Sequence, residues 1–87
     1  MPLFMIERNY AEQLEANRDD ALKVVQINDD VGVQWLFSFL SADKKKTYCL
    51  YEAPSAEEIR EAARRANLPA DEIIEVNELR PEMFGVQ

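Results

Sequence analysis

Two glutamates and a cysteine are the residues whose types and spacing could carry chemistry in this sequence. Glu7 ends an apolar run near the N-terminus, whereas Cys49 and Glu52 belong to an apolar run in the middle of the chain. Two carboxylates on one face of a sheet, beside aromatic side chains, could hold a divalent metal or take separate acid and base roles. The simpler interpretation is that a strand-end glutamate is solvated and that a lone cysteine in an apolar strand is a small core residue.

The sequence lacks the residue types and motifs that many other catalytic and binding sites require. The chain contains no histidine, which removes the commonest general base and the commonest transition-metal ligand. No CxxC pair, glycine-rich phosphate loop, GxSxG elbow or HExxH helix occurs in the sequence. Asp43 and the three lysines that follow it could catch a phosphate, but a polar hairpin tip explains them more simply.

The composition also limits the partners and the location. Seventeen acidic residues against ten basic ones give a formal charge of −7, which repels phosphate backbones and anionic lipid headgroups, so we expect neither nucleic acid nor a membrane as a partner. The single cysteine cannot form an internal disulfide, and no run has the length of a membrane span or the pattern of a signal peptide. We therefore expect a cytoplasmic protein.

The element that must position the candidate residues is a β-hairpin over residues 33–54, where two alternating apolar runs flank a charged connector. A turn centred on Asp43 and Lys44 sets the register, and a slip of one residue would exchange the faces of the second strand. The expected pairs are Trp35–Glu52, Phe37–Leu50 and Phe39–Tyr48 on one face, and Leu36–Tyr51, Ser38–Cys49 and Leu40–Thr47 on the other.

A strand over residues 3–8 and a long amphipathic helix are expected before the hairpin. Asn9 and Glu12 have the spacing of a capping box, which predicts that the helix begins at Asn9. Its apolar stripe should hold Leu14, Ala21, Val24 and Val25, with Asn17 at the wet rim, until residues 28–32 break the pattern.

A second helix and a last strand follow the hairpin. Ser55 and Glu58 repeat the capping-box signature, and Asn67 and Pro69 should end that helix. The apolar side of the helix consists of Ile59, Ala62, Ala63 and Ala66, and the last strand of Ile73, Ile74 and Val76.

This order of elements predicts a single α+β domain over residues 1–87 with a ferredoxin-like βαββαβ fold. Right-handed crossovers place both helices on one face of a four-stranded antiparallel sheet with strand order 4-1-3-2. We expect the covered face to hold Phe4, Ile6, Leu36, Leu40, Cys49, Tyr51, Ile74 and Val76, and the bare face Leu3, Met5, Glu7, Trp35, Phe37, Phe39, Tyr48, Leu50 and Glu52. So large an apolar surface predicts a homodimer through the open sheet face. The tail, residues 80–87, should be either frayed or docked on a partner.

Several segments resemble a known family. VQWLFSFL, TYCLYEAP and EEIREAARRANLPAD, with the opening LFMIER, are similar to small ferredoxin-like domains of unknown function whose characterised member is described as a nickel-binding protein. The resemblance covers residues 3–76 and implies the fold, a homodimer and a divalent metal. The matching positions are Glu7, Trp35, Ser38, Tyr48, Cys49, Tyr51, Glu52 and Pro54.

The resemblance implies only part of a metal site in this chain, because two expected ligands are missing. Family members tend to have histidine at the positions of Phe37 and Ala62, both apolar here. The ligands that the resemblance still implies are Glu7 and Glu52, with Cys49 or Tyr48 as further candidates. Carboxylates alone suit a hard cation better than nickel.

Three functions follow as hypotheses. The first, which we favour, is a small-ligand or metal-binding module, with a pocket between the open face and its cover in which Glu7, Tyr48 and Glu52 are the polar groups and Trp35 and Phe37 the wall. The second is a homodimeric interaction domain without a ligand. The third, from fold analogy alone, is a cofactor-free dimeric α+β barrel enzyme of the monooxygenase or isomerase type. No activated nucleophile or clear base supports catalysis.

Overall fold

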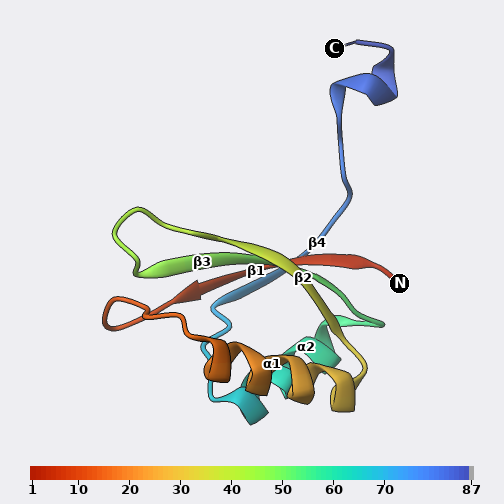
Figure 1. Ribbon diagram of the computed structural model, residues 1–87. Coiled ribbons are helices and arrows are strands. Elements are labelled where there is room, and N and C mark those ends of the chain that lie inside the picture. The colour runs from red at the N-terminus through yellow and green to blue at the C-terminus, as the bar shows by residue number, and fades with distance from the viewer. Residues whose placement is uncertain (87) are drawn as a thin grey trace.

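The computed structural model describes residues 1–86 and has the βαββαβ order that the sequence predicts. The elements are β1 (Leu3–Asn9), α1 (Arg18–Val31), β2 (Gln34–Leu40), β3 (Lys46–Glu52), α2 (Ala56–Ala66), β4 (Glu72–Val76) and a short 3₁₀ helix, η1 (Pro81–Phe84). The strands form one antiparallel sheet in the order β2-β3-β1-β4, and both helices lie on the same side of it (Figure 1). The predicted α+β class and strand order are confirmed.

The β2–β3 register agrees with the prediction over most of its length. Phe37 pairs with Leu50, Ser38 with Cys49, Phe39 with Tyr48 and Leu40 with Thr47. The ladder is irregular between Trp35 and Phe37, where a β-bulge inserts one residue and shifts the pairing on one side.

The bulge makes the prediction for Trp35 wrong. Trp35 pairs with Tyr51 instead of Glu52, so its ring lies on the helix-covered face and packs against the core. Leu36, expected on the covered face, lies at the bulge without a pairing partner on β3. A bulge adds one residue to a strand, so every residue on its far side changes face relative to simple alternation.

Strand β4 also departs from the prediction. Ile73 pairs with Ile6 and packs against the core, whereas Ile74 pairs with Met5 and is 52% exposed on the open face. Val76 pairs with Leu3, again on the open face. Two adjacent isoleucines carry no alternation, so only the pairing with β1 decides which of them is buried.

Helix α1 begins later than predicted. Its N-cap is Asn17, whose Oδ1 accepts a hydrogen bond from the Asp20 N–H at 2.9 Å, while Asn9 is the last residue of β1. The segment between them is tied to the hairpin tip, because the Tyr10 and Leu14 N–H groups donate to Lys45 and Lys44 carbonyls at 2.8 and 2.7 Å. Those bonds hold residues 10–16 outside the helix, so the capping box predicted at Asn9 does not form.

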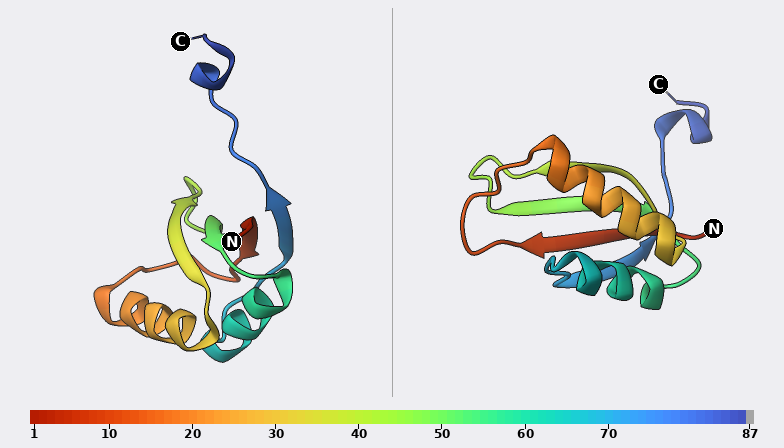
Figure 2. Two further views of the ribbon diagram at one scale, coloured as in Figure 1. Left: turned by 90° about the vertical axis from the view of Figure 1, so that its right-hand side faces the viewer. Right: turned by 60° about the horizontal axis from the view of Figure 1, so that its bottom comes forward.

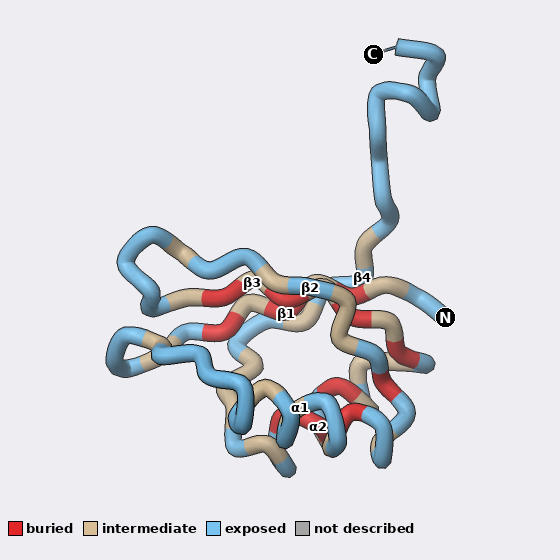
Figure 3. The backbone as a smooth tube through the Cα atoms, in the orientation of Figure 1, coloured by how far each residue is buried: buried red, intermediate tan, exposed pale blue. Residues whose placement is uncertain are grey.

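The core lies between the helical layer and the sheet (Figures 2 and 3). Its buried members are Phe4, Ile6, Val33, Cys49, Tyr51, Ala53, Ile59 and Ala62. From α1 it receives Ile27 and Val31, which the predicted stripe omitted, whereas Val25, which the stripe included, is 42% exposed.

Helix α2 follows the prediction. The Ser55 Oγ accepts from the Glu57 N–H at 3.3 Å and donates to the Glu58 carboxylate. Asn67 adopts the left-handed conformation, with φ 55°, and ends the helix.

The C-terminal segment leaves the domain. After β4 the chain rises on the side of the sheet opposite to the helices and ends in η1 (Figure 1). Its apolar side chains Leu79, Met83, Phe84 and Val86 are all exposed. The segment does not pack on its own domain, and whether it frays or docks on a partner stays a prediction; Gln87 lies outside the described residues. Across residues 1–86, no helix has the length and apolar character needed to cross a membrane.

Candidate functional site

Four of the five predicted pocket residues share the open face of the sheet. Glu7, Phe37, Tyr48 and Glu52 lie there, with Glu7 paired to Tyr48 on the central strands. Trp35 lies on the covered face instead, so it cannot form a wall of that pocket.

The two glutamates are not brought together. Glu7 pairs with Tyr48 and Leu3 pairs with Glu52, which places the carboxylates four positions apart along β3. At ~3.3 Å per residue the separation is about 13 Å, too far for one ion. Glu7 Oε2 instead lies 3.7 Å from Lys46 Nζ and accepts a hydrogen bond from Asn9 at 3.3 Å. Residues 1–86 contain no group of three or more cysteine or acidic side chains that could hold a metal ion.

A large cavity lies on the other side of the sheet, between α1 and strands β1–β3. Its volume is about 590 Å³, within the range typical of small-molecule sites. The α1 wall contributes Ala21, Val24 and Ile27, and β2 contributes Trp35 and Leu40. Most of the surface is therefore apolar, as in a pocket that receives an organic body.

The polar groups of the cavity floor largely bond one another. The Tyr10 hydroxyl lies 3.1 Å from Thr47 Oγ1, and the Cys49 thiol donates to the same oxygen at 3.5 Å. Trp35 Nε1 donates to Ser38 Oγ at 2.8 Å. These bonds orient the side chains around the cavity and hold Cys49 in a packed, buried position.

Arg8 is the charged group of this floor. It is 3% exposed, its Nη1 donates to the Pro69 carbonyl at 2.6 Å, and its guanidinium carbon lies 5.8 Å from the centre of the Tyr51 ring. Burial raises the pKa of the Tyr51 phenol, against a hydrogen bond from Asn28 and the nearby positive charge of Arg8, which both lower it.

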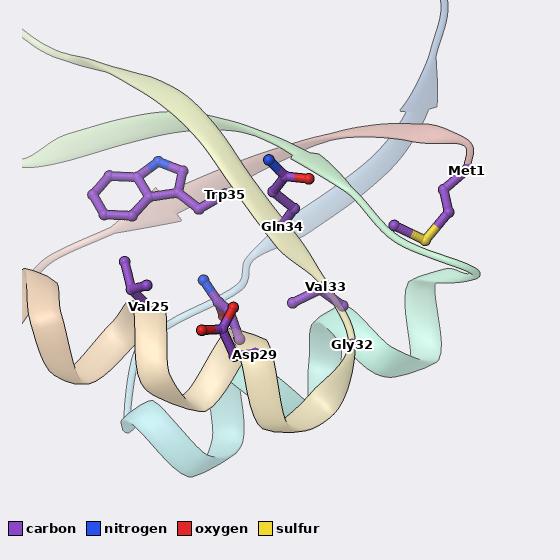
Figure 4. Close-up of a pocket in the computed structure, with 8 residues that line it drawn as sticks. Met1, Val25, Asp29, Gly32, Val33, Gln34 and Trp35 are labelled. Atoms are coloured by element: carbon purple, nitrogen blue, oxygen red, sulfur yellow. The ribbon is translucent and has the colours of Figure 1, made fainter.

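A second, smaller hollow of about 420 Å³ lies at the other end of α1. In Figure 4 the α1 side chains Val25 and Asp29 face β2, where Trp35 and Gln34 lie, with Met1 across from them. Trp35 lines both the hollow and the larger cavity.

The sequence analysis missed the cavity, although a signal for its charged residue was present. Phe4, Ile6 and Arg8 alternate along β1, so they share one face, and all three are buried. An arginine in phase with two core residues indicates a buried cation. The cavity itself had no such signal, because it depends on where α1 begins and on the bulge that turns Trp35 inward.

Together, the fold and this cavity define a ferredoxin-like α+β domain with a ligand-sized space between its helices and its sheet. The family model described as "Nickel responsive protein SCO4226-like" matches residues 4–76, and the chain belongs to this family. A solved structure, described as the crystal structure of SCO4226 from Streptomyces coelicolor A3(2), is similar, with a TM-score of 0.77 and 25% identity over 90% of this chain and 99% of that chain. No curated protein matches. The resemblance noted from the sequence is confirmed.

Proposed function

We propose that this domain is a small-ligand-binding module and that the ligand occupies the cavity between α1 and the sheet. The observation that carries the proposal is the cavity itself: about 590 Å³, with apolar walls and a few converging polar groups. A domain of 87 residues has little core to spare. The space is open to solvent, and the apolar body of a bound ligand would remove its apolar walls from water.

The side chains of this domain do not fit a nickel site, although the family description speaks of a nickel response. Phe37 and Ala62 stand where the resemblance implies histidine, and here they lie on opposite sides of the sheet: Phe37 on the open face, Ala62 buried in α2. The remaining donors, Glu7 and Glu52, are hard oxygen ligands set four positions apart along β3. We therefore assign the metal no part in the proposed function.

The open face supports assembly as a second proposal. Phe37 and Phe39 are 49% and 62% exposed, their rings stack edge to face at 5.6 Å, and Ile74 adds a further exposed apolar group. A second copy of the chain would cover this surface, and any pocket formed with Glu7 and Glu52 would require that cover.

Native mass spectrometry of the protein purified from its own host tests both proposals. We expect a dimer mass, and a retained organic mass on each subunit. The matched variants are Ala21→Phe, which fills the cavity, and Leu22→Phe, the next residue on α1, which is exposed and outside the cavity. Retained mass should disappear in the first variant and remain in the second. Loss in both, or in neither, would contradict the assignment of the ligand to this cavity.

A further inference from the structure

Arg8 stands out among the cations of the chain because it is buried. It is 3% exposed, and among residues 1–86 it is the one charged side chain in the buried class. A buried charge normally has an opposite charge beside it, since burial removes its hydration.

No such partner lies beside Arg8 within residues 1–86. The ion pairs of this part of the chain involve Lys46, Arg60, Arg64, Arg65 and Arg80, and none includes Arg8. Its neighbour Glu7 points to the opposite face and lies beside Lys46. The carbonyl of Pro69 and the Tyr51 ring stabilise the guanidinium but do not neutralise its charge.

The acids that line the same cavity are at its rim. Glu15 and Asp20 are exposed, and Asp20 is already engaged with the Asn17 cap through its N–H and its carboxylate. The basic residues of the rim, Lys23 and Arg65, are exposed as well, and Arg65 pairs with Glu61 at 2.6 Å. The floor therefore presents one net positive charge beneath apolar walls.

We propose that the cavity binds an organic monocarboxylate, with its carboxylate on the Arg8 guanidinium and its apolar body between α1 and Trp35. This rests on the proposed ligand-binding function and specifies its ligand class. A guanidinium pairs with a planar carboxylate through parallel N–H donors. A phosphate dianion would need a second cation at the floor, and the other buried side chains of the lining with a hydroxyl or a thiol are Thr47, Tyr51 and Cys49.

The test compares acids with their amides. Trp35 is the single tryptophan and lines the cavity, so its fluorescence reports binding there. Octanoate and cyclohexylacetate are titrated against octanamide and cyclohexylacetamide, which keep the apolar body and lose the charge. We expect the acids to bind at least about tenfold more tightly, as a charge-assisted bidentate pair allows.

Substitution of Arg8 provides the second arm. Arg8→Met should bring the acids to the affinity of the amides, Arg8→Lys should retain part of the difference, and Arg60→Met, on an exposed arginine outside the cavity, should change nothing. If Arg8→Met does not fold, Arg8→Lys and the comparison of acids with amides still test whether a carboxylate binds Arg8.

The outcomes separate the two proposals. Equal affinity for acid and amide, or no response to either, overturns the carboxylate proposal. The ligand-binding function is then tested separately, by whether the host-purified protein retains an organic mass and whether Ala21→Phe loses it. A retained ligand that is neutral or cationic likewise overturns the carboxylate proposal, whereas a retained carboxylic acid supports it.

Discussion

Asn17 caps the N-terminus of α1, so replacing it tests where this helix begins. The Asn17 Oδ1 accepts from the Asp20 N–H at 2.9 Å, and its Nδ2 donates to the Asp20 carboxylate at 2.8 Å. Asn17→Ala removes both bonds and leaves a helix N–H without its partner. The loss of such a cap destabilises a protein by about 1 kcal/mol.

That magnitude is measurable in a domain of this size. A loss of about 1 kcal/mol lowers the Tm of a domain of 60–100 residues by roughly 4–8 °C. Thermal and urea unfolding followed by circular dichroism would measure it, with an unchanged urea slope showing that compactness is the same. Asn17, Asp20 and Ala21 line the cavity, so the variant should also weaken the response of Trp35 to a bound acid.

Asn9→Ala is the matched control, because Asn9 is the asparagine that the sequence predicted as the cap of this helix. Its side chain is exposed and donates one hydrogen bond to Glu7 at 3.3 Å. The bond from its backbone N–H to Asp71 at 2.7 Å survives the substitution. We expect a change within about 0.5 kcal/mol. A larger loss at Asn9 than at Asn17 would refute the position of the helix start, and with it the α1 wall of the cavity.

Three further predictions concern the open face, the core and acid stability. Phe37→Glu should dissociate the proposed homodimer while the monomer stays folded, because Phe37 is already 49% exposed in one chain; a dimer that sediments unchanged would contradict an interface on the open face. Cys49→Ala should lower the free energy of unfolding by roughly 1–2 kcal/mol, and rapid labelling of the native thiol would show that Cys49 is not packed as described. Hydrogen bonds from Arg64 and Arg65 lower the pKa of Glu61 from 4.5 to about 2. A depressed native pKa adds stability above the unfolded value, and this stability is lost as the pH falls through the interval from about 4.5 to about 2. Glu61→Gln should flatten the pH dependence of the urea midpoint in that interval by a small, salt-sensitive amount, since the group is exposed. If the variant and the unmodified protein have the same pH profile, Glu61 does not contribute to acid stability.

The local sequence patterns of this chain were sufficient to predict the order of its elements and the topology of its sheet. The alternation of residues 37–40 and 47–50 placed each of those side chains on its observed face, because a strand has a strict two-residue period. The cap at Ser55 and the helix end at Asn67 are local features, set within a few residues, and both formed as predicted. The element order then left few topologies, and the observed strand order is among them.

The site depended on contacts between distant parts of the chain. The sequence predicted Asn9 as the helix cap, but hydrogen bonds from residues 10 and 14 to the hairpin tip keep that segment outside the helix, and Asn17 is the cap instead. The bulge that turns Trp35 inward arises from pairing between β2 and β3, and the choice between Ile73 and Ile74 from pairing between β1 and β4. A cavity is the space left after such elements have packed, so its volume and its buried Arg8 became visible only in the tertiary structure.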